Sequence, residues 1–288
     1  MSLAEFVRQP SFRSLSGLFG GGPAKPGDSY GAPGMGSSTA IAVVTSVGLL
    51  LFWWYVTAQG WIKPLFLPSP GAVIATFRDL WVEGFSNATL AEHTWASLQR
   101  VFGAFLLACV TAIPIGVAMG MNRVCRGIFD PPIEFYRPIP PLAYLPLVII
   151  WAGIGEMAKI LLIYLAIFAP MALSARAGVR SVSIEQIHAA YSLGASRTQV
   201  VGLVVLKAAM PEILTGMRIG IGFGWTTLVA AEMVAAQEGL GVMVLNAAEF
   251  LVTDVVVTGI VIIGVIAYAF DLLMRRIERW LVPWKGKV

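Results

Sequence analysis

The sequence predicts an all-α integral membrane protein with six transmembrane helices in each chain. Three observations predict this class: an apolar composition, a series of long uncharged segments, and a one-sided distribution of basic residues. Hydrophobic side chains make up 57% of the 288 residues and charged ones only 12%, whereas a soluble domain has about 45–50% apolar and about 25% charged residues. So few charges cannot cover the surface of a water-soluble globule, and we therefore expect the chain to lie in a membrane.

The first element in order is an N-terminal tail, residues 1–38, which is rich in Gly, Pro and Ser. Such a composition does not support a packed core or a regular helix. No apolar segment of signal-peptide type lies within its first 30 residues, so we do not expect it to be a cleaved leader. We interpret it as a flexible cytoplasmic tail that precedes a six-helix membrane domain over residues 39–288.

Six apolar segments follow the tail. A bilayer core of roughly 30 Å needs about 20 helical residues. The predicted spans cover residues 39–58, 101–121, 138–155, 160–175, 213–235 and 255–270. The third segment is interrupted by prolines, and the fifth contains Arg218 and Glu232.

The basic residues give an orientation that fits six spans, because cytoplasmic segments carry an excess of Lys and Arg. With both termini in the cytoplasm, 16 of the 20 basic residues lie on the inner side. The four on the outer side are Lys63, Arg78, Arg100 and Lys159. This asymmetry explains the net charge of +4, so no nucleic acid partner is needed to account for it. We expect membrane lipid to surround the chain.

The longest internal loop, at about residues 176–212, has features of its own. Ser183 can cap a helix that begins at residue 184. Gly194 is expected to end that helix, and Val200 and Leu203 begin a second helical pattern. We predict two short helices joined at a glycine and lying at the cytoplasmic surface. The alternative is an ordinary amphipathic loop, although loops of this length usually have a task.

The third segment is predicted to line a transport pathway. Four prolines within an apolar run disfavour a regular helix. Backbone groups released in a membrane must be satisfied by protein or by a water-filled cavity, and broken segments often surround substrate sites. Tyr136, Pro140, Pro141 and Tyr144 are therefore candidate pathway residues, and a packing kink away from the pathway is the alternative.

The fifth segment contributes two further pathway candidates, Glu232 and Trp225. An ionisable group at membrane depth is a functional candidate by default, whereas an interfacial position would make Glu232 structural. Trp225 follows glycines at positions 216, 220 and 224, so it could face a cavity or anchor the chain at the membrane interface. Glycines spaced by four residues permit close helix packing, either within one chain or between two copies.

The internal loop resembles a known family of membrane proteins. The residues around Gly194 resemble the EAA loop of ABC importer permeases, the coupling helix that docks on the ATPase subunit. His188 stands where Glu is usual, and Lys207 stands where Pro is usual. The resemblance assigns ATPase coupling to His188, Ala189, Ala190, Tyr191, Gly194, Ala195 and Ser196.

Further segments resemble the nitrate, sulfonate, taurine and bicarbonate branch of these permeases, and the taurine permeases in particular. They lie at residues 136–156, 160–173, 211–234, 249–254 and 281–284. The resemblance implies a type I importer fold that works as a homodimer in the bacterial inner membrane. It further implies two cytoplasmic ABC ATPase subunits and a periplasmic taurine-binding protein that delivers the substrate.

The sequence lacks the motif that would let this chain bind ATP itself. No G-x-x-x-x-G-K-[ST] sequence occurs, so we expect ATP and Mg²⁺ to bind a separate ATPase subunit. No Cys/His cluster predicts a metal, and no catalytic constellation predicts an enzyme. The alternatives are a permease for another small anion (an alkanesulfonate, nitrate or bicarbonate), an ion-driven secondary transporter, and a membrane anchor without a pathway.

Overall fold

The computed structural model describes residues 39–284, and every element named within that range is helical. The helices are α3 Thr39–Ala58, α4 Pro70–Val82, α5 Leu90–Met121, α6 Arg123–Tyr136, α7 Pro141–Ala152, α8 Glu156–Arg180, α9 Ile184–Ser192, α10 Arg197–Gln199, α11 Leu206–Ala235, α12 Leu240–Glu249 and α13 Thr253–Leu281. A π-helical turn, Val200–Val205, joins α10 to α11. The predicted N-terminal tail lies outside the described residues.

The chain divides between Gln59 and Gly60 into two compact units. The described part of the first unit is essentially α3, whose bounds agree with the first predicted span. Its 20 residues correspond to about 30 Å of helix, the thickness of a bilayer core. Its apolar side chains are mostly exposed in the structure, as expected of a helix that faces lipid or another protein.

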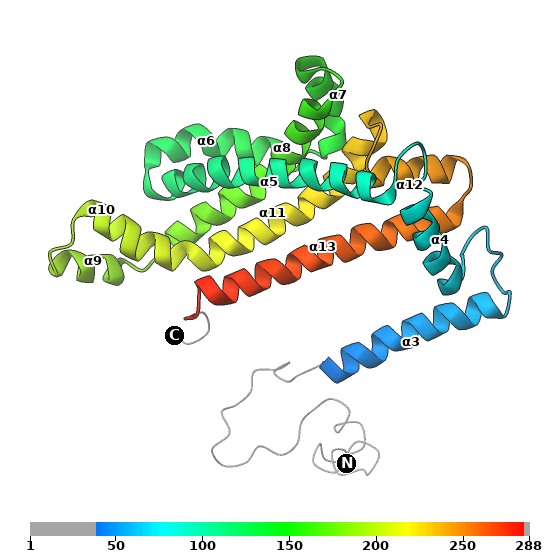
Figure 1. The fold of residues 1–288 in the computed structure, drawn as a ribbon. Coiled ribbons are helices and arrows are strands. Elements are labelled where there is room, and N and C mark those ends of the chain that lie inside the picture. Colours follow the sequence, from blue (N-terminus) through cyan, green and yellow to red (C-terminus); the bar gives the residue numbers. More distant parts are fainter. Residues whose placement is uncertain (1–38, 285–288) are drawn as a thin grey trace, which may run out of the picture. The chain divides into compact units, whose positions relative to one another are not determined.

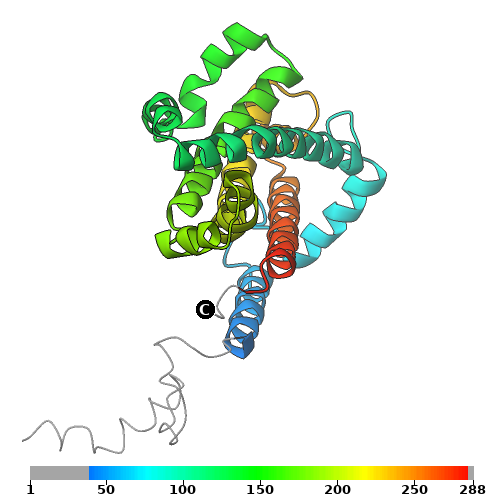
Figure 2. The same ribbon diagram turned by 90° about the vertical axis from the view of Figure 1, so that its left-hand side faces the viewer.

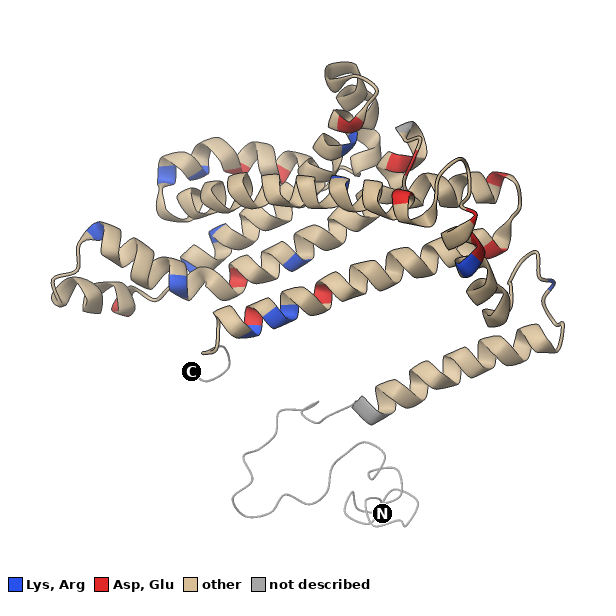
Figure 3. Cartoon of the chain, viewed as in Figure 1, with Lys and Arg blue, Asp and Glu red and all other residues tan. Residues whose placement is uncertain are grey.

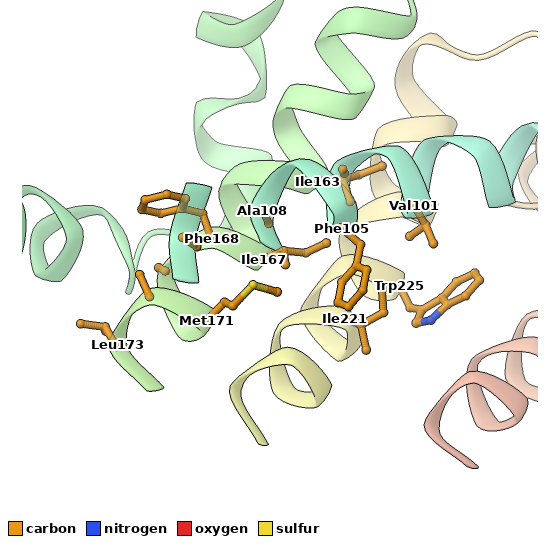
Figure 4. Packing of buried hydrophobic residues seen from close by; sticks show 14 of the residues in the cluster. Val101, Phe105, Ala108, Ile163, Ile167, Phe168, Met171, Leu173, Ile221 and Trp225 are labelled. Atoms are coloured by element: carbon orange, nitrogen blue, oxygen red, sulfur yellow. The ribbon is translucent and has the colours of Figure 1, made fainter. Parts of the chain in front are cut away.

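The second unit is built around α8, which packs along both α5 and α11. Figure 1 shows these helices together, and α13 is seen nearly end-on beside α11 in Figure 2. The interior is apolar, with Ile163, Ile167 and Met171 of α8 fully buried. These side chains meet Phe105 of α5 and Ile221 of α11 (Figure 4), so α8 forms the centre of the helical packing.

Glycines allow α8 to approach its two neighbours closely. A Cβ atom at Gly216 of α11 would lie 2.3 Å from the Cβ of Ser174 on α8. On the other side, a Cβ atom at Gly116 of α5 would lie 2.3 Å from the carbonyl oxygen of Ala172. The glycine spacing in the fifth predicted span therefore serves packing between helices of one chain, as the first of the two alternatives predicts.

Most predicted spans are shorter than the helices that contain them. The second prediction begins at residue 101, whereas α5 begins at Leu90. Thr89 caps α5 through the backbone N–H of Glu92, whose carboxylate accepts a hydrogen bond from the Thr89 N–H in return. The charge of Arg100 is neutralised within the protein. Because its first turn is capped and the charge of Arg100 is paired, α5 begins before the uncharged segment from which the span was predicted.

The predicted count of six spans is not confirmed, because five described helices are long and apolar enough to cross a membrane. The third predicted span forms α7, which has only 12 residues and about 18 Å of length. The helix before it, α6, contains 14 residues and turns back along α5 (Figure 1). Prolines separate α6 from α7, so this region is a broken segment and not a single continuous span.

The second unit carries many of its basic residues towards one end. Figure 3 shows Lys and Arg at the start of α6, in α10, and in the C-terminal part of α13. The same end contains α9 and α10, which form the predicted surface loop. This distribution is the structural counterpart of the charge asymmetry read from the sequence.

Candidate functional site

A cavity of about 520 Å³ lies where α6, α7, α8 and α11 meet. Its lining is mainly apolar but includes one guanidinium group, two phenol rings and a hydroxyl group. The lining residues are Tyr136, Arg137, Pro138, Ile139, Pro140, Pro141, Tyr144, Leu165, Ala166, Ala169, Pro170, Leu173, Ser174, Ile219 and Phe223. Four of the six predicted pathway residues, Tyr136, Pro140, Pro141 and Tyr144, therefore line one cavity.

The cavity lies near the middle of the membrane-spanning helices. On α8 its lining extends from Leu165 to Ser174, and on α11 it includes Ile219 and Phe223. Each set is close to the midpoint of its helix. A cavity with a broken backbone at this depth is the arrangement that membrane proteins use around a substrate route.

Proline explains why this backbone is irregular. Pro138, Pro140 and Pro141 lack an N–H group and restrict the preceding residues, so α6 cannot continue into α7. The chain makes a turn in which the N–H of Ile139 donates to the carbonyl of Tyr136 at 3.0 Å. The next bond, from the N–H of Ala143 to the carbonyl of Pro140 at 2.8 Å, starts α7.

Arg137 brings a positive charge to the cavity wall. It follows α6, whose 14 residues rise about 21 Å from the turn after α5. Its nearest carboxylate, that of Glu134, is 3.7 Å away, and more than half of the Arg137 side chain is exposed. The three-residue spacing of the two side chains allows such a pair.

Glu134 is shared between two arginines. Arg176 of α8 approaches Glu134 at 3.5 Å and also forms an ion pair with Asp130. The four side chains form a network without net charge beside the cavity. Since Glu134 has a second cationic partner, Arg137 can turn towards an anion in the cavity without leaving this carboxylate unpaired.

The two tyrosines have different surroundings. The Tyr136 hydroxyl donates to the carbonyl oxygen of Leu165 at 3.4 Å, which holds its ring against α8. Tyr144, on the first turn of α7, is half-buried and also lines the cavity. Tyrosine combines an aromatic face with a polar hydroxyl, and this combination suits a small ligand with charged groups.

Glu232, a predicted pathway residue, does not line this cavity. Its side chain is fully buried and accepts a hydrogen bond from Arg100 Nη1 at 2.7 Å. The Ser97 hydroxyl donates to the same carboxylate at 2.7 Å, and the Gly241 N–H donates at 2.8 Å. Glu232 thus connects the N-terminal part of α5 with the first turn of α12. This set of contacts supports a structural role.

A second carboxylate completes the cluster. Glu156, at the start of α8, accepts from Arg100 Nε at 2.6 Å and from Arg100 Nη2 at 2.9 Å. Lys159 donates to Glu156 at 2.7 Å. The side chain of Glu156 is 57% exposed, whereas those of Arg100 and Glu232 are almost completely buried. Arg100 therefore links an exposed carboxylate to a buried one.

Trp225, the other predicted pathway residue, also lies outside the cavity lining. Its side chain is 6% exposed and belongs to the apolar core formed by α5, α8 and α11. Figure 4 shows it beside Ile221, on the side of the core where Val101 lies. Its indole N–H is buried without a hydrogen-bond partner among the described residues.

The predicted coupling residues form one exposed turn. Ser183 caps α9 through the N–H of Gln186, as predicted. Gly194 adopts a φ of +81°, a conformation that favours glycine. Ser196 caps α10, which continues through the π-helical turn into α11. Two helical segments joined at Gly194 are therefore confirmed, and the second is continuous with a membrane-spanning helix.

This turn presents apolar surface to its surroundings. Leu193 is 89% exposed and Tyr191 is 46% exposed. His188, Ala189 and Ser196 are also exposed, whereas Ala190 and Ala195 are half-buried against the base of the loop. Exposed apolar side chains on a well-formed turn are typical of a surface that binds another protein.

Sequence reasoning missed the cavity contributions of Arg137 and of several α8 residues. The signal for Arg137 was its position between Tyr136 and Pro138, inside the proline-rich segment. Pro170 was the corresponding signal on α8, since proline disrupts the hydrogen-bond ladder of the helix facing the break. Facing prolines on two neighbouring segments are a better indicator of the cavity than the ionisable residue in α11.

Comparison with known proteins identifies the family. Residues 112–283 match the family of binding-protein-dependent transport system inner membrane components. The match covers more than half of the sequence, and the chain belongs to this family.

Individual relatives narrow the comparison. The chain is 55% identical to the taurine transport system permease protein TauC of Escherichia coli (strain K12), over 86% of this chain and 90% of that protein. It is 32% identical to the putative aliphatic sulfonates transport permease protein SsuC of Bacillus subtilis (strain 168), over 83% of this chain and 85% of that protein. The chain is thus a multi-pass membrane protein of the ABC permease class.

A solved structure supports the type I permease fold. A chain of the MetNI methionine ABC transporter, in an inward-facing conformation, superposes with a TM-score of 0.56 at 20% sequence identity. The match covers 66% of this chain and 94% of that one. At this identity the similarity concerns the fold.

Proposed function

We propose that this chain is the permease subunit of an ATP-driven importer that moves taurine into the cytoplasm. The observation that carries the proposal is the 55% identity to TauC over 86% of the chain. The mid-membrane cavity beside α6 and α7 supports a substrate route. The exposed turn around Gly194 supports coupling to a separate ATPase, which an ion-driven carrier or a simple anchor does not need.

The importer that we propose contains a second copy of this chain, two ABC ATPase subunits and a periplasmic taurine-binding protein. Support for the second copy comes from α7, which is too short to cross a bilayer alone and exposes much apolar surface. Ile150 is 77% exposed and Trp151 is 71% exposed. Packing of α7 against a second copy would bury these side chains and close the cavity on its open side.

ATP binding supplies the energy in this proposal. ATP and Mg²⁺ bind the ATPase subunits, and this chain binds neither. When the ATPases close, they move the turn formed by His188, Ala189, Ala190, Tyr191, Gly194, Ala195 and Ser196. Because α10 continues into α11, this movement reaches the helix that lines the cavity. The two permease copies then open alternately towards the periplasm and the cytoplasm, with both termini of each chain on the cytoplasmic side.

The test is ATP hydrolysis by the reconstituted importer. The chain would be purified with the ATPase encoded beside it, placed in liposomes, and assayed with the binding protein. We expect taurine-loaded binding protein to stimulate hydrolysis and to drive uptake of labelled taurine. The binding protein without taurine is the control.

Two results would contradict the proposal in different ways. Stimulation by an alkanesulfonate, nitrate or bicarbonate, but not by taurine, would retain the importer and exclude taurine. Failure to form a complex with any ATPase, together with uptake driven by an ion gradient, would replace the importer by a secondary transporter.

A further inference from the structure

We propose that the cavity lined by Arg137, Tyr136, Tyr144 and Ala166 is a binding site for a zwitterion, in which the permease itself recognises both ends of its substrate. The Arg137 guanidinium binds the sulfonate group. The Ala166 carbonyl and the two tyrosine rings receive the ammonium group. This inference rests on the proposed function, because it takes a small aminosulfonate as the substrate.

The anionic end of the site follows from the depth and partners of Arg137. A charged side chain at mid-membrane depth is costly and is retained for a function. The Glu134 carboxylate, 3.7 Å from Arg137, lies beyond normal hydrogen-bonding distance, and Arg176 also approaches it. Arg137 can therefore donate to an entering anion, and its planar group suits two oxygens of a sulfonate as it suits those of a carboxylate or phosphate.

The cationic end of the site follows from Pro170. In a regular helix the residue at position 170 would donate its N–H to the carbonyl of Ala166, but proline has no N–H to donate. Ala166 and Pro170 both line the cavity. The Ala166 carbonyl is thus an acceptor that its own helix does not satisfy through position 170, and an ammonium group can donate to it.

Two aromatic rings complete the cationic end. Tyr136 is held against α8 by its bond to the Leu165 carbonyl, which is adjacent in sequence to Ala166. Tyr144 lines the cavity from the first turn of α7. An ammonium group close to the face of such a ring is stabilised by the negative face of its π system.

A site of this kind has to bind weakly, because a transported molecule must leave as well as enter. Its contribution is selectivity: a zwitterion satisfies both ends, whereas a simple anion satisfies only one. We therefore expect taurine to bind better than ethanesulfonate, which lacks the ammonium group. The preference belongs to the permease and is separate from that of the binding protein.

The test measures equilibrium binding of labelled taurine to the complete permease–ATPase complex in lipid nanodiscs, without the binding protein. We expect saturable binding that is weakened at least about tenfold by Arg137→Gln, as the loss of a charged hydrogen-bonding partner implies. Arg123→Gln is the matched control, because Arg123 begins the helix that Arg137 follows, is exposed, and does not line the cavity.

A second pair of variants tests the cationic end. Tyr144→Leu removes the ring and should weaken taurine binding several-fold, with little effect on ethanesulfonate. Tyr144→Phe keeps the ring and should weaken taurine binding less than Tyr144→Leu does. If Arg137→Gln does not assemble with the ATPase, this pair of Tyr144 variants still tests whether the cavity binds taurine.

The proposal is overturned if the unmodified complex shows no saturable taurine binding, or if Arg137→Gln and Tyr144→Leu both bind taurine as the unmodified complex does. Either result leaves the proposed importer intact as long as the loaded binding protein still drives taurine uptake. The absence of any taurine uptake by the unmodified importer is the separate result that would remove the proposed function.

Discussion

At the scale of single residues, the chain uses its arginine charges in two different ways. Arg137 has a distant ion-pair partner and an exposed surface in a cavity. Arg100 is buried and is bonded to Glu156, to Glu232 and to the carbonyl of Glu238. A buried charge whose three guanidinium nitrogens all donate to protein oxygens contributes to structure, whereas a charge beside a cavity with a loosely held partner is available to a ligand.

The structural role of Glu232 makes a direct prediction. Replacing Glu232 by Gln removes its charge at a fully buried position and leaves Arg100 with less compensation. Breaking a buried ion pair costs about 3 kcal/mol or more. We therefore expect a clear loss of thermal stability, measured by unfolding of the purified complex in detergent, while taurine binding at the cavity persists in the folded fraction.

The matched control is Glu156→Gln, which removes the other carboxylate that binds Arg100. Because Glu156 is 57% exposed, water can replace part of its interaction with Arg100 and Lys159, so its loss should cost less stability than the loss of the fully buried Glu232. Equal losses of stability for the two variants would contradict the view that burial distinguishes these carboxylates.

At the scale of helices, the packing of α11 on α8 depends on a few glycines. A Cβ atom at Gly216 would meet the side chain of Ser174 at 2.3 Å, whereas a Cβ atom at Gly222 would have no neighbour within 4 Å. Gly216→Ala should therefore force the helices apart at a cost of about 1–3 kcal/mol. Gly222→Ala should be neutral or slightly stabilising, because alanine favours helix.

The same unfolding measurement distinguishes these two variants. The pair has equal chemistry on one helix and differs only in which face receives the methyl group. If Gly222→Ala destabilised the protein as much as Gly216→Ala, the close contact would have to lie on another face of α11.

The positions of most helices along the chain were predictable from the sequence. The residues at which they begin and end were not, and neither was the turn of α6 back along α5. The bounds of α3 agree with the first prediction because uncharged residues extend over its whole length. The start of α5 was missed because its first turns carry charges that are satisfied by Thr89 and by distant carboxylates. Partners of this kind are set by tertiary structure, and hydropathy alone does not report them.

The candidate site was predicted in part for a similar reason. The prolines of the α6–α7 connection indicated a break, and the residues around it do line the cavity. Glu232 was favoured because it is ionisable at membrane depth, but its partners Ser97 and Arg100 are more than a hundred residues away in sequence. The sequence identifies a group that needs a partner and leaves open whether that partner is protein or substrate.

At the scale of the whole molecule, the coupling turn and the cavity are connected by continuous helix. Leu193 is 89% exposed at the turn, and the chain beyond it passes through α10 into α11. A charge at position 193 should weaken docking of the ATPase, because an apolar side chain would be replaced by one that must stay hydrated. We therefore expect Leu193→Asp to lose most of the co-purified ATPase and most of the taurine uptake.

The Leu193→Asp permease should unfold at the same temperature as the unmodified permease, since Leu193 contributes little to the interior. Leu251→Asp is the control: Leu251 is 67% exposed in the turn between α12 and α13, and the ATPase should remain bound there. Retention of the ATPase by Leu193→Asp would show that the ATPase docks on another part of the permease. Loss of the ATPase with unchanged stability of the permease would show that the ATPase docks at the turn around Gly194. This turn leads through α10 into α11, whose middle lines the cavity.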